Sequence, residues 1–496
     1  MQTAMTRTRD TSRGFGHAMA QRSRPRGVAI RIGVLIVFTL GPVQASHALG
    51  LADAYEAALQ HDPLYAAAAQ EKAAGDANRA IGRSYLLPSL SANYANYRDW
   101  TRTTYLDSQN GNQSINQTYH AYSAGVSLRQ PLINYEGLAR YRYGKAVALA
   151  SDATFDDRGE DLLVRVLTAY TDTVFAFDQL ALASAQTTAL DEQLAVNEAM
   201  LRSGEGTRTD VLETRAKLEL ARSDVADAQD SLDNAAHALD AVTGVPLSAD
   251  VAKLDRLSDA FQPSMPSPAG FEQWRDIALD SNAELIAERH TVEAARQQLE
   301  VVHAGFYPHV DLVASIGQNQ SNTVDIIGQR YFTKAAGIEV TIPLYSGGLV
   351  RASSEQASAN YQKTQFELQD ETNKVLLELR KQYNLCVSSL SRIRALQSAV
   401  DSATLLITAT HKSVQAGTRT NFDVLSATQQ LYQARRDLAR ARYQYMIANL
   451  SLRHAAGILT AQDLYETARW FTPPGALTPI AKAGAPAPVA RQAHAM

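Results

Sequence analysis

Two copies of one short motif contain the residues of this chain that are best suited to attract or repel ions. The first copy reads Gly204-Glu-Gly-Thr207-Arg208-Thr-Asp210-Val-Leu, and the second, in the other half of the chain, reads Gly417-Thr-Arg419-Thr420-Asn-Phe-Asp423-Val-Leu. A carboxylate attracts cations and repels anions, whereas a guanidinium group can hold a carboxylate or carbonyl group of a neighbouring segment. The motif therefore indicates electrostatic selection of ions rather than chemistry on covalent bonds.

The same residue types also suit a tight turn between two helices. Glycine ends a helix, threonine caps the next one, and an acidic residue at position N3 completes a capping box near the positive end of the helix dipole. This local role is our main interpretation of the motif. Gly204 and Gly417 are then the helix ends, and Thr207 and Thr420 are the N-caps of the helices that follow. Asp210 and Asp423 occupy the N3 positions.

A turn between two long antiparallel helices would lie at the far end of the molecule, where a pore would be narrowest. Carboxylates repeated there by the symmetry of an oligomer would form a ring that attracts cations. Arg208 and Arg419 could bond to neighbouring helices and hold this end shut. We therefore predict a gate that contains Asp210, Asp423 and the two arginines.

Patterns for catalysis or metal binding are not found in the sequence. It contains no phosphate-binding glycine loop, nucleophile elbow, zinc-binding histidine pair or dinucleotide fingerprint. Histidines occur singly, as at His61 and His237, and Cys386 is the only cysteine. A disulfide within one chain and a Cys-rich metal site are thereby excluded. We predict that the chain is not an enzyme and assign no catalytic, cofactor or metal site.

Long helices are expected before and after each turn. No proline occurs between Pro131 and Pro246 or between Pro343 and Pro473, so that helices can run unbroken there. We expect helices over 137–203 and 347–416, and shorter single helices over 49–86 and 270–305. After the turns, apolar residues recur every seven positions, at Val211, Leu218, Val225, Leu232 and Leu239 and again at Val424, Leu431, Leu438, Tyr445 and Leu452. Mostly alanines stand three positions further on, which predicts close coiled-coil packing.

Segments of alternating polarity lie beside isolated prolines. They cover 89–101, 122–129, 310–316 and 338–342, and their pattern predicts strands with one apolar face. The strands that these segments mark are expected to be about 9 to 11 residues long, which is the length of a tilted membrane-crossing strand. The corners between helix and strand are assigned to Pro88, Pro131, Pro308 and Pro343. A soluble four-stranded sheet with one wet face is the alternative.

The strands are expected to form two hairpins with long polar tips, over 107–118 and 318–330. Aromatic residues crowd the first hairpin, as an interfacial girdle would; they are Tyr94, Tyr97, Trp100, Tyr105, Tyr119 and Tyr122. Four strands cannot close a barrel, and lipid does not tolerate an open sheet edge. Insertion into lipid would therefore require several chains to pool their strands.

The first 48 residues have the pattern of an export signal. Basic residues precede an apolar run over 28–40, and Ala45 or Ala48 closes a small-residue cleavage pattern. Removal of this leader takes away seven arginines and one aspartate, so that the formal net charge moves from -4 to -10. An acidic exported protein is a poor candidate for binding nucleic acid. The later sequence contains no apolar stretch long enough for a membrane-spanning helix.

The duplicated pattern divides the chain into consecutive parts. Residues 1–48 are the signal peptide, 49–245 the first repeat, 246–268 a linker and 269–459 the second repeat. The strand hairpins are placed at about 88–133 and about 308–344, and the tips of the helical hairpins at 204–210 and 417–423. Residues 460–496 form a C-terminal extension, which we expect to be disordered from about 473.

Residues 49–466 resemble the TolC family of outer-membrane channel proteins. The resemblance rests on Ala54-Tyr-Glu-Ala-Ala58, the corner Leu87-Pro88, Pro343-Leu-Tyr-Ser-Gly-Gly348 and above all the run from Gly417 to Tyr432. It implies a homotrimer in which each chain gives four strands to one twelve-stranded transmembrane β-barrel, continued by a helical periplasmic tunnel. It also implies docking onto a periplasmic adaptor protein and an inner-membrane ABC or proton-driven transporter. The cargo would be protein, including toxins, in type I secretion, or small molecules in efflux.

The resemblance also implies roles at the tips. Asp423 matches an aspartate of an acidic ring at the periplasmic entrance, Arg419 a residue that latches the closed helices, and Asp210 its partner region. Two positions depart from the family pattern, because Ser426 replaces a second ring aspartate and Val414 a latching tyrosine. These departures imply a weaker lock and lower cation affinity. The competing interpretation is a periplasmic or surface coiled-coil structural or adhesive protein with no channel.

Overall fold

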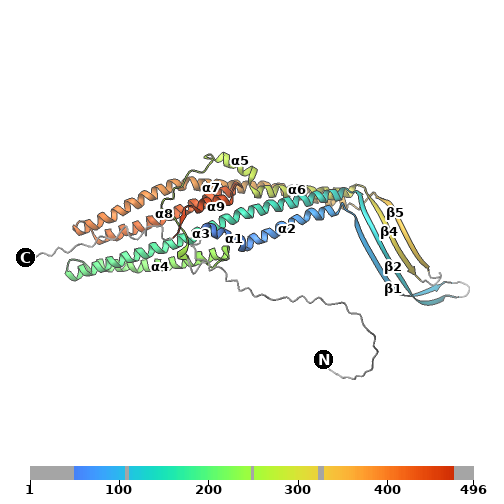
Figure 1. The fold of residues 1–496 in the computed structure, drawn as a ribbon, viewed down its shortest axis with the longest axis horizontal. Helices are drawn as coiled ribbons and strands as arrows, with labels where there is room; N and C mark the ends of the chain where they lie inside the picture. The colour runs from blue at the N-terminus through green and yellow to red at the C-terminus, as the bar shows by residue number, and fades with distance from the viewer. Residues whose placement is uncertain (1–49, 107–110, 247–250, 322–328, 474–496) are drawn as a thin grey trace, which may run out of the picture. The chain divides into compact units, whose positions relative to one another are not determined.

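A computed structural model of the chain describes residues 50–106, 111–246, 251–321 and 329–473. The expected signal peptide at 1–48 and the expected tail beyond 473 lie outside the described residues. So do 247–250 of the linker and the segments 107–110 and 322–328 of the two hairpin tips. Within the described part, helices form one side of Figure 1 and a four-stranded sheet the other.

The helices of the first repeat are α1 (Leu51–His61), α2 (Pro63–Ser84), α3 (Tyr135–Ser203) and α4 (Arg208–Thr243). The prediction of a single helix over 49–86 is wrong, because the chain breaks at Asp62. This residue caps α2 by accepting a hydrogen bond from the amide of Tyr65 at 2.7 Å. The proline that follows favours an extended conformation at Asp62 and suits the first position of the new helix.

The second repeat has the same order of helices, α5 (Phe271–Ser281), α6 (Ala283–His303), α7 (Leu349–Gln415) and α8 (Asn421–Ala455). The single helix predicted over 270–305 is again wrong. Asn282 interrupts it and accepts a hydrogen bond from the amide of Leu285 at 2.9 Å. A last helix, α9 (Ala461–Ala468), follows, and the short strands β3 (Arg256–Leu257) and β6 (Phe471–Thr472) pair with each other.

The main sheet is antiparallel in the order β1 (Ser89–Tyr105), β2 (Gln113–Ile133), β4 (His309–Ser321) and β5 (Gln329–Thr341). The strand length predicted from the alternation is wrong, since the strands are longer, with 17, 21, 13 and 13 residues. Pairing continues to Tyr105 opposite Gln113 and to Ser321 opposite Gln329. Much of each expected polar tip is therefore strand. These segments lack apolar alternation and are rich in glutamine, asparagine and serine, so pairing with the neighbouring strand extends them.

The register gives the sheet two different faces. Leu90, Leu128, Ala314 and Ala336 lie in one row across the four strands, and their neighbours on that face include Val126, Ile316, Leu312, Ile338 and Val340. The next row along the strands belongs to the opposite face and consists of Ser91, Ser127, Ser315 and Ala335. One face is thus apolar and the other is lined by small and polar residues. The aromatic residues expected to form one girdle divide between both faces.

Helix and strand join differently in the two repeats. A single residue, Asn134, separates β2 from α3, and its side chain caps α3 by accepting a hydrogen bond from the amide of Gly137 at 2.9 Å. The seven residues 342–348 separate β5 from α7. Pro131 lies inside β2, next to a register irregularity, rather than at a corner. A bulge is where an inner strand tolerates proline.

The long helix α3 packs against α2, α4, α6 and α8, and α7 packs against α6 and α8. All five heptad residues of α8 are buried, and four of the five in α4 are buried. The largest core lies where α3 faces α8. It includes Leu162, Val166 and Tyr170 from α3 and Tyr443, Met446 and Leu450 from α8.

Candidate functional site at the two helical tips

The first copy of the motif forms the turn between α3 and α4. Gly204 has a φ of 82°, a left-handed conformation that favours glycine, and Thr207 is the N-cap of α4. The Thr207 hydroxyl accepts from the amide of Asp210 at 3.1 Å and donates to its carboxylate at 2.6 Å. The Thr207 amide donates to the same carboxylate at 3.2 Å. The side chains of Thr207 and Asp210 thus accept hydrogen bonds from backbone amides at the start of α4.

The second copy forms the turn between α7 and α8. Gly417 has a φ of 73° and Thr420 is the N-cap of α8. The amide and the hydroxyl of Thr420 each donate to the carboxylate of Asp423 at 2.9 Å. These two hydrogen bonds, with a smaller contribution from the charge of Arg419, hold the pKa of Asp423 below its ordinary value. The carboxylate is therefore ionised at any physiological pH.

The two predicted latching arginines differ in their contacts. Arg419 donates from Nη1 to the hydroxyl of Thr410 in α7 at 3.4 Å, so it binds within its own hairpin. Arg208 is exposed, and no hydrogen bond or ion pair joins it to another residue in the described part of this chain. The departing positions of the motif lie nearby, with Ser426 exposed on α8 and Val414 half-buried near the end of α7.

Near the tips, the two helical hairpins are joined by four further residues that are not among the predicted site residues. Gln193 and Asn197 of α3, Thr214 of α4 and Asn421 of α8 form hydrogen bonds with one another. One signal was available, because Thr214 occupies a position of the heptad pattern that is mostly alanine. A polar residue at such a position requires a partner within the helix bundle.

At the end of the sheet nearest the helices, the polar face carries an ion cluster. Arg129 of β2 donates from Nε to the buried carboxylate of Asp311 in β4 at 2.9 Å, and lies 3.6 Å from Glu339 in β5. The three side chains lie on neighbouring strands. They place charge on the face opposite the apolar rows, close to Pro131 and its bulge.

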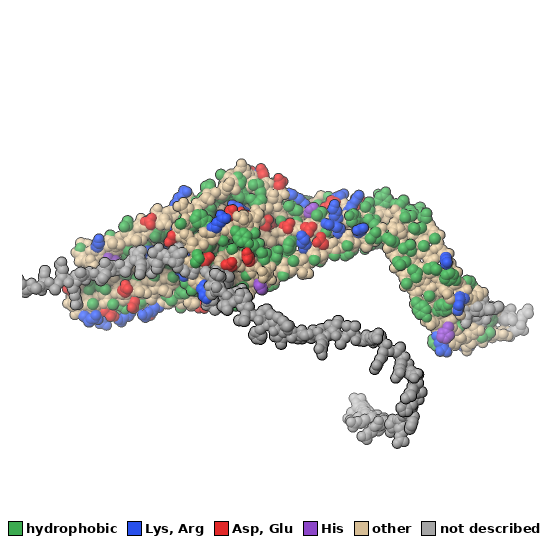
Figure 2. All heavy atoms as spheres, in the orientation of Figure 1, with side chains coloured by type: hydrophobic (Ala, Val, Ile, Leu, Met, Phe, Trp, Pro, Cys, Tyr) green, Lys and Arg blue, Asp and Glu red, His purple; other side chains and the backbone are tan. Residues whose placement is uncertain are grey.

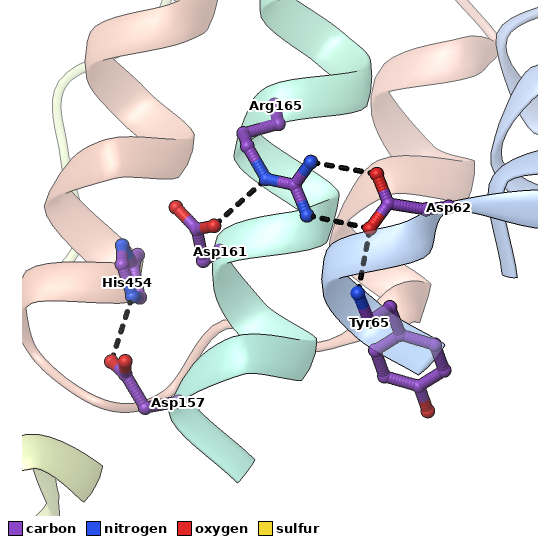
Figure 3. Close-up of polar contacts among 6 residues, drawn as sticks. All are labelled: Asp62, Tyr65, Asp157, Asp161, Arg165 and His454. Atoms are coloured by element: carbon purple, nitrogen blue, oxygen red, sulfur yellow. Dashed lines mark hydrogen bonds and ion pairs between the residues drawn. The ribbon is translucent and has the colours of Figure 1, made fainter. Parts of the chain in front are cut away.

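A second polar cluster lies where the start of α2 meets α3 (Figure 3). Arg165 holds the buried carboxylate of Asp62 with both terminal nitrogens, at 2.8 and 3.1 Å, and binds Asp161 through Nε at 2.8 Å. Burial alone would raise the pKa of Asp62. Hydrogen bonds from Arg165 and from the Tyr65 amide outweigh it, so the pKa lies below its ordinary value. This cluster fixes α2 on α3.

Titratable groups also meet between α3 and α8. His454 of α8 lies 3.2 Å from the carboxylate of Asp157 in α3. Burial opposes protonation of His454, but the acidic neighbours, Asp157 first, raise its pKa above the ordinary value. Burial raises the pKa of Glu160 to about 7. These groups join the two repeats far from the tips, so their role is in stability.

Neither a metal centre nor a membrane-spanning helix is found in the described part of the chain. Its histidines, cysteine and acidic residues nowhere gather in threes in a way that could hold a metal ion. None of the helices described combines the length with the apolar character that spanning a membrane requires.

Comparison with known proteins gives a consistent result. A family model described as outer membrane efflux protein matches residues 54–245 and 274–458. Alkaline protease secretion protein AprF of Pseudomonas aeruginosa is 42% identical over 417 residues, which cover 84% of this chain and 86% of that protein. Proteases secretion protein PrtF of Dickeya chrysanthemi is 38% identical, with coverage of 90% and 96%.

The fold is similar to that of the outer membrane protein VceC from Vibrio cholerae. The two structures have a TM-score of 0.70 over 82% of this chain and 96% of the other, at 19% identity. At this identity the similarity concerns the fold alone.

Proposed function

The chain belongs to the outer membrane efflux protein family, and from this premise we propose that three copies form one duct for the export of proteins. The family predicted from the sequence is confirmed. The protein is an outer-membrane exit channel with a periplasmic helical extension, and it is not an enzyme. A coiled-coil structural or adhesive protein without a channel is not favoured by these relatives.

The main support for a pooled barrel is a sheet whose apolar face is left exposed by the rest of the described chain. Leu90, Tyr94 and Ile338 are 72, 72 and 67% exposed, and hydrophobic side chains spread over the sheet in Figure 2. Strands β1 and β5 have free edges within the described sheet. In our proposal, β1 of one copy pairs with β5 of the next, which removes the edges and turns the apolar face to lipid.

The small polar face of the sheet would then line the bore. Ser91, Ser127 and Ser315 form one row of it, and Gly125 lies opposite Gly317 in the next row. Such side chains leave room and offer little apolar surface for a passing chain to adhere to. This lining suits a polypeptide that must pass without being held.

The helices support the same assembly. Leu212 and Leu220 of α4 are 53 and 63% exposed, and Phe366, Leu377 and Leu405 of α7 are 71, 71 and 74% exposed. Helices α4 and α7 lie at opposite margins of the packed helices, because α3 and α8 lie between them. Exposed apolar residues at both margins favour contact between copies. A periplasmic adaptor and an inner-membrane transporter would complete the duct at the tips.

Protein cargo is proposed because two relatives named for protease secretion match this chain over 84 and 90% of its length. Deletion of the gene in its own organism tests the proposal. We expect at least one protein to disappear from the culture medium while susceptibility to small toxic compounds stays unchanged. Increased susceptibility with an unchanged set of secreted proteins would instead indicate efflux.

We propose that Asp423 from three copies forms an acidic ring at the entrance. The substitution Asp423→Asn removes the charge while leaving an oxygen that can still accept hydrogen bonds from Thr420. In planar bilayers, we expect the wild-type protein to conduct and to be blocked by multivalent cations, and the variant to lose this block. Asp233→Asn, which removes a charge from the exposed surface of α4 away from the turns, is the control. Unchanged block in Asp423→Asn would contradict the ring.

A further inference from the structure

A closed ring of hydrogen bonds joins the two helical hairpins near their tips. Asn197 Nδ2 and Asn421 Nδ2 donate to Thr214 Oγ1 at 2.8 and 3.0 Å. Gln193 Nε2 donates to Asn197 Oδ1 and to Asn421 Oδ1 at 3.0 and 3.1 Å. Each of the four residues is therefore bonded to two others, and the bonds form a closed loop. We call these four residues the amide ring.

Three members of the amide ring are buried, Gln193 is half-buried, and the Thr214 hydroxyl uses its full hydrogen-bonding capacity. Thr214 is 0%, Asn197 4% and Asn421 8% exposed. Besides accepting two hydrogen bonds, Thr214 donates one to the carbonyl of Asp210 at 2.7 Å. A hydroxyl can donate one bond and accept two. Because each amide also has a partner inside the ring, separating the hairpins here would leave polar groups unpaired at the cost that burial imposes.

The position of the ring is informative. Asn421 is the first residue of α8 and follows the N-cap Thr420, so the ring reaches directly into the second turn. About one turn further into the bundle lies an apolar layer of Leu190, Leu218, Ala221 and Leu425. On the surface beyond it, Lys217 of α4 donates to Gln429 of α8 at 3.1 Å. Of these two hydrogen bonds between α4 and α8, the one within the ring lies nearer the tips.

The duplication does not repeat the ring. At the spacing that sets Asp210 against Asp423, its members Gln193, Asn197, Thr214 and Asn421 correspond to Leu406, Thr410, Ala427 and Arg208. Thr410 donates to the carbonyl of Leu406 within α7 at 2.8 Å, and Ala427 has no polar side-chain atom. The ring therefore has no counterpart around the second turn, and helix capping does not explain it.

We propose that the amide ring is a positioning lock, which holds α8 against the first helical hairpin and sets the resting aperture at the entrance. This rests on the proposed channel function. A polar contact in a helix bundle specifies one arrangement of the helices, because any other arrangement leaves its members unpaired. Apolar packing such as that of Leu425 is less selective. The ring thus defines one closed arrangement, and its loss frees the start of α8.

The test compares Thr214→Val with two matched controls. Valine keeps the shape of threonine but removes the acceptor, so Asn197 and Asn421 lose a partner. Thr214→Ser keeps the hydroxyl. Thr187→Val removes a similar hydroxyl, which bonds to the carbonyl of Ala221 at 3.3 Å within the first hairpin and does not reach α8. Asn421→Ala is a second variant in case Thr214→Val does not assemble.

Two measurements are made on each purified full-length variant in detergent or bilayers. For Thr214→Val and Asn421→Ala we expect faster amide hydrogen exchange over 208–214 and 421–428 and a several-fold higher resting conductance. Thr214→Ser and Thr187→Val should resemble the wild type in both. Lower thermal stability with unchanged tip exchange and conductance would overturn the positioning role.

The outcome can be separated from that of the proposed function. If the wild-type protein forms no pore, the channel proposal fails, whereas exchange at the tips still reports whether the ring holds α8. If the wild type conducts and Thr214→Val has the same conductance and tip exchange, the lock fails and the channel proposal stands.

Discussion

The two helical hairpins share a sequence pattern but differ in what surrounds them. Helices α4 and α8 both begin at a capping turn and carry apolar residues at the same heptad positions. On the other side of α8, Tyr443, Met446 and Leu450 are buried against α3. The corresponding positions of α4 are Asp230, Asp233 and His237, which are exposed.

This difference shows how a duplicated unit acquires two roles. The common heptad residues pair each helix with the long helix before it, α3 or α7. A second apolar stripe allows α8 to pack on two neighbours, whereas α4 with its charged stripe remains at a margin. The hairpins are therefore equivalent in local structure and different in position, and the amide ring lies where they meet.

The largest effect on stability should come from the residues of α8 that are buried against α3. Met446→Ala removes a buried side chain between α3 and α8 and should lower the free energy of unfolding by about 2 to 5 kcal/mol. Asp233→Ala, at the corresponding exposed position of α4, should change it by no more than about 0.5 kcal/mol. Denaturant unfolding of both purified variants measures the difference. Equal losses would contradict the two positions that we assign to the hairpins.

The next effect concerns pH at the interface of the repeats. The raised pKa of Glu160 means that the folded state binds more protons than the unfolded state between about pH 4.5 and 7, so stability falls as pH rises through this window. The raised pKa of His454 acts in the same direction, with its stabilisation lost as pH rises through the folded value. The loss due to Glu160 should be roughly 1 to 2 kcal/mol, because solvent reaching the partly buried carboxyl screens it.

Thermal unfolding at pH 5 and pH 8 measures this loss. Glu160→Gln should reduce the difference between the two pH values. Glu205→Gln, at an exposed glutamate of the first turn, should leave the difference unchanged. A wild-type protein that is more stable at pH 8 would show that other groups decide the pH dependence.

A smaller effect is expected at the capping turns. Thr207→Ala removes a hydroxyl that both accepts from the amide and donates to the carboxylate of Asp210, and should destabilise the start of α4 by about 1 kcal/mol. In the second turn, the Thr420 hydroxyl only donates to Asp423, so Thr420→Ala should have the smaller effect. Amide exchange over 208–211 and 421–424 compares the two. The reverse order would show that hydrogen bonding at the N-cap does not control fraying.

The smallest effect should come from the surface of the first hairpin. Arg215 of α4 bonds to Glu198 of α3 at 2.9 Å, with both side chains accessible to solvent. Arg215→Ala should lower stability by less than about 0.5 kcal/mol, because water and salt screen exposed pairs. Denaturant midpoints at low and high salt test this. A large loss that persists at high salt would mean that Arg215 contributes by packing.

Local signals predicted much of the fold. Heptads and proline-free windows located the long helices, and alternating polarity located the strands. The breaks at Asp62 and Asn282 were missed, although the Asp-Pro pair at the first break is itself a helix-start signal. The strand lengths were underestimated because the outer parts of the hairpins lack apolar alternation, and pairing with a neighbouring strand extends them.

The candidate site was predictable only where it depends on neighbours in sequence. Capping turns are local, so the types and spacing of their residues suffice. The amide ring requires Thr214 and Asn421, which belong to different repeats, to come together, and no local pattern specifies that. The acidic ring and the arginine latch depend on other copies of the chain, and they stay predictions.

The unequal joints between sheet and helices have a mechanical consequence. Because Asn134 alone separates β2 from α3, a rotation of α3 would be transmitted directly to β2. The segment 342–348, which ends in Gly347 and Gly348, is a longer connection that would let α7 rotate relative to β5. If the entrance widens, we expect α7 and α8 to move while α3 and α4 keep their position. The sheet in the membrane then need not deform.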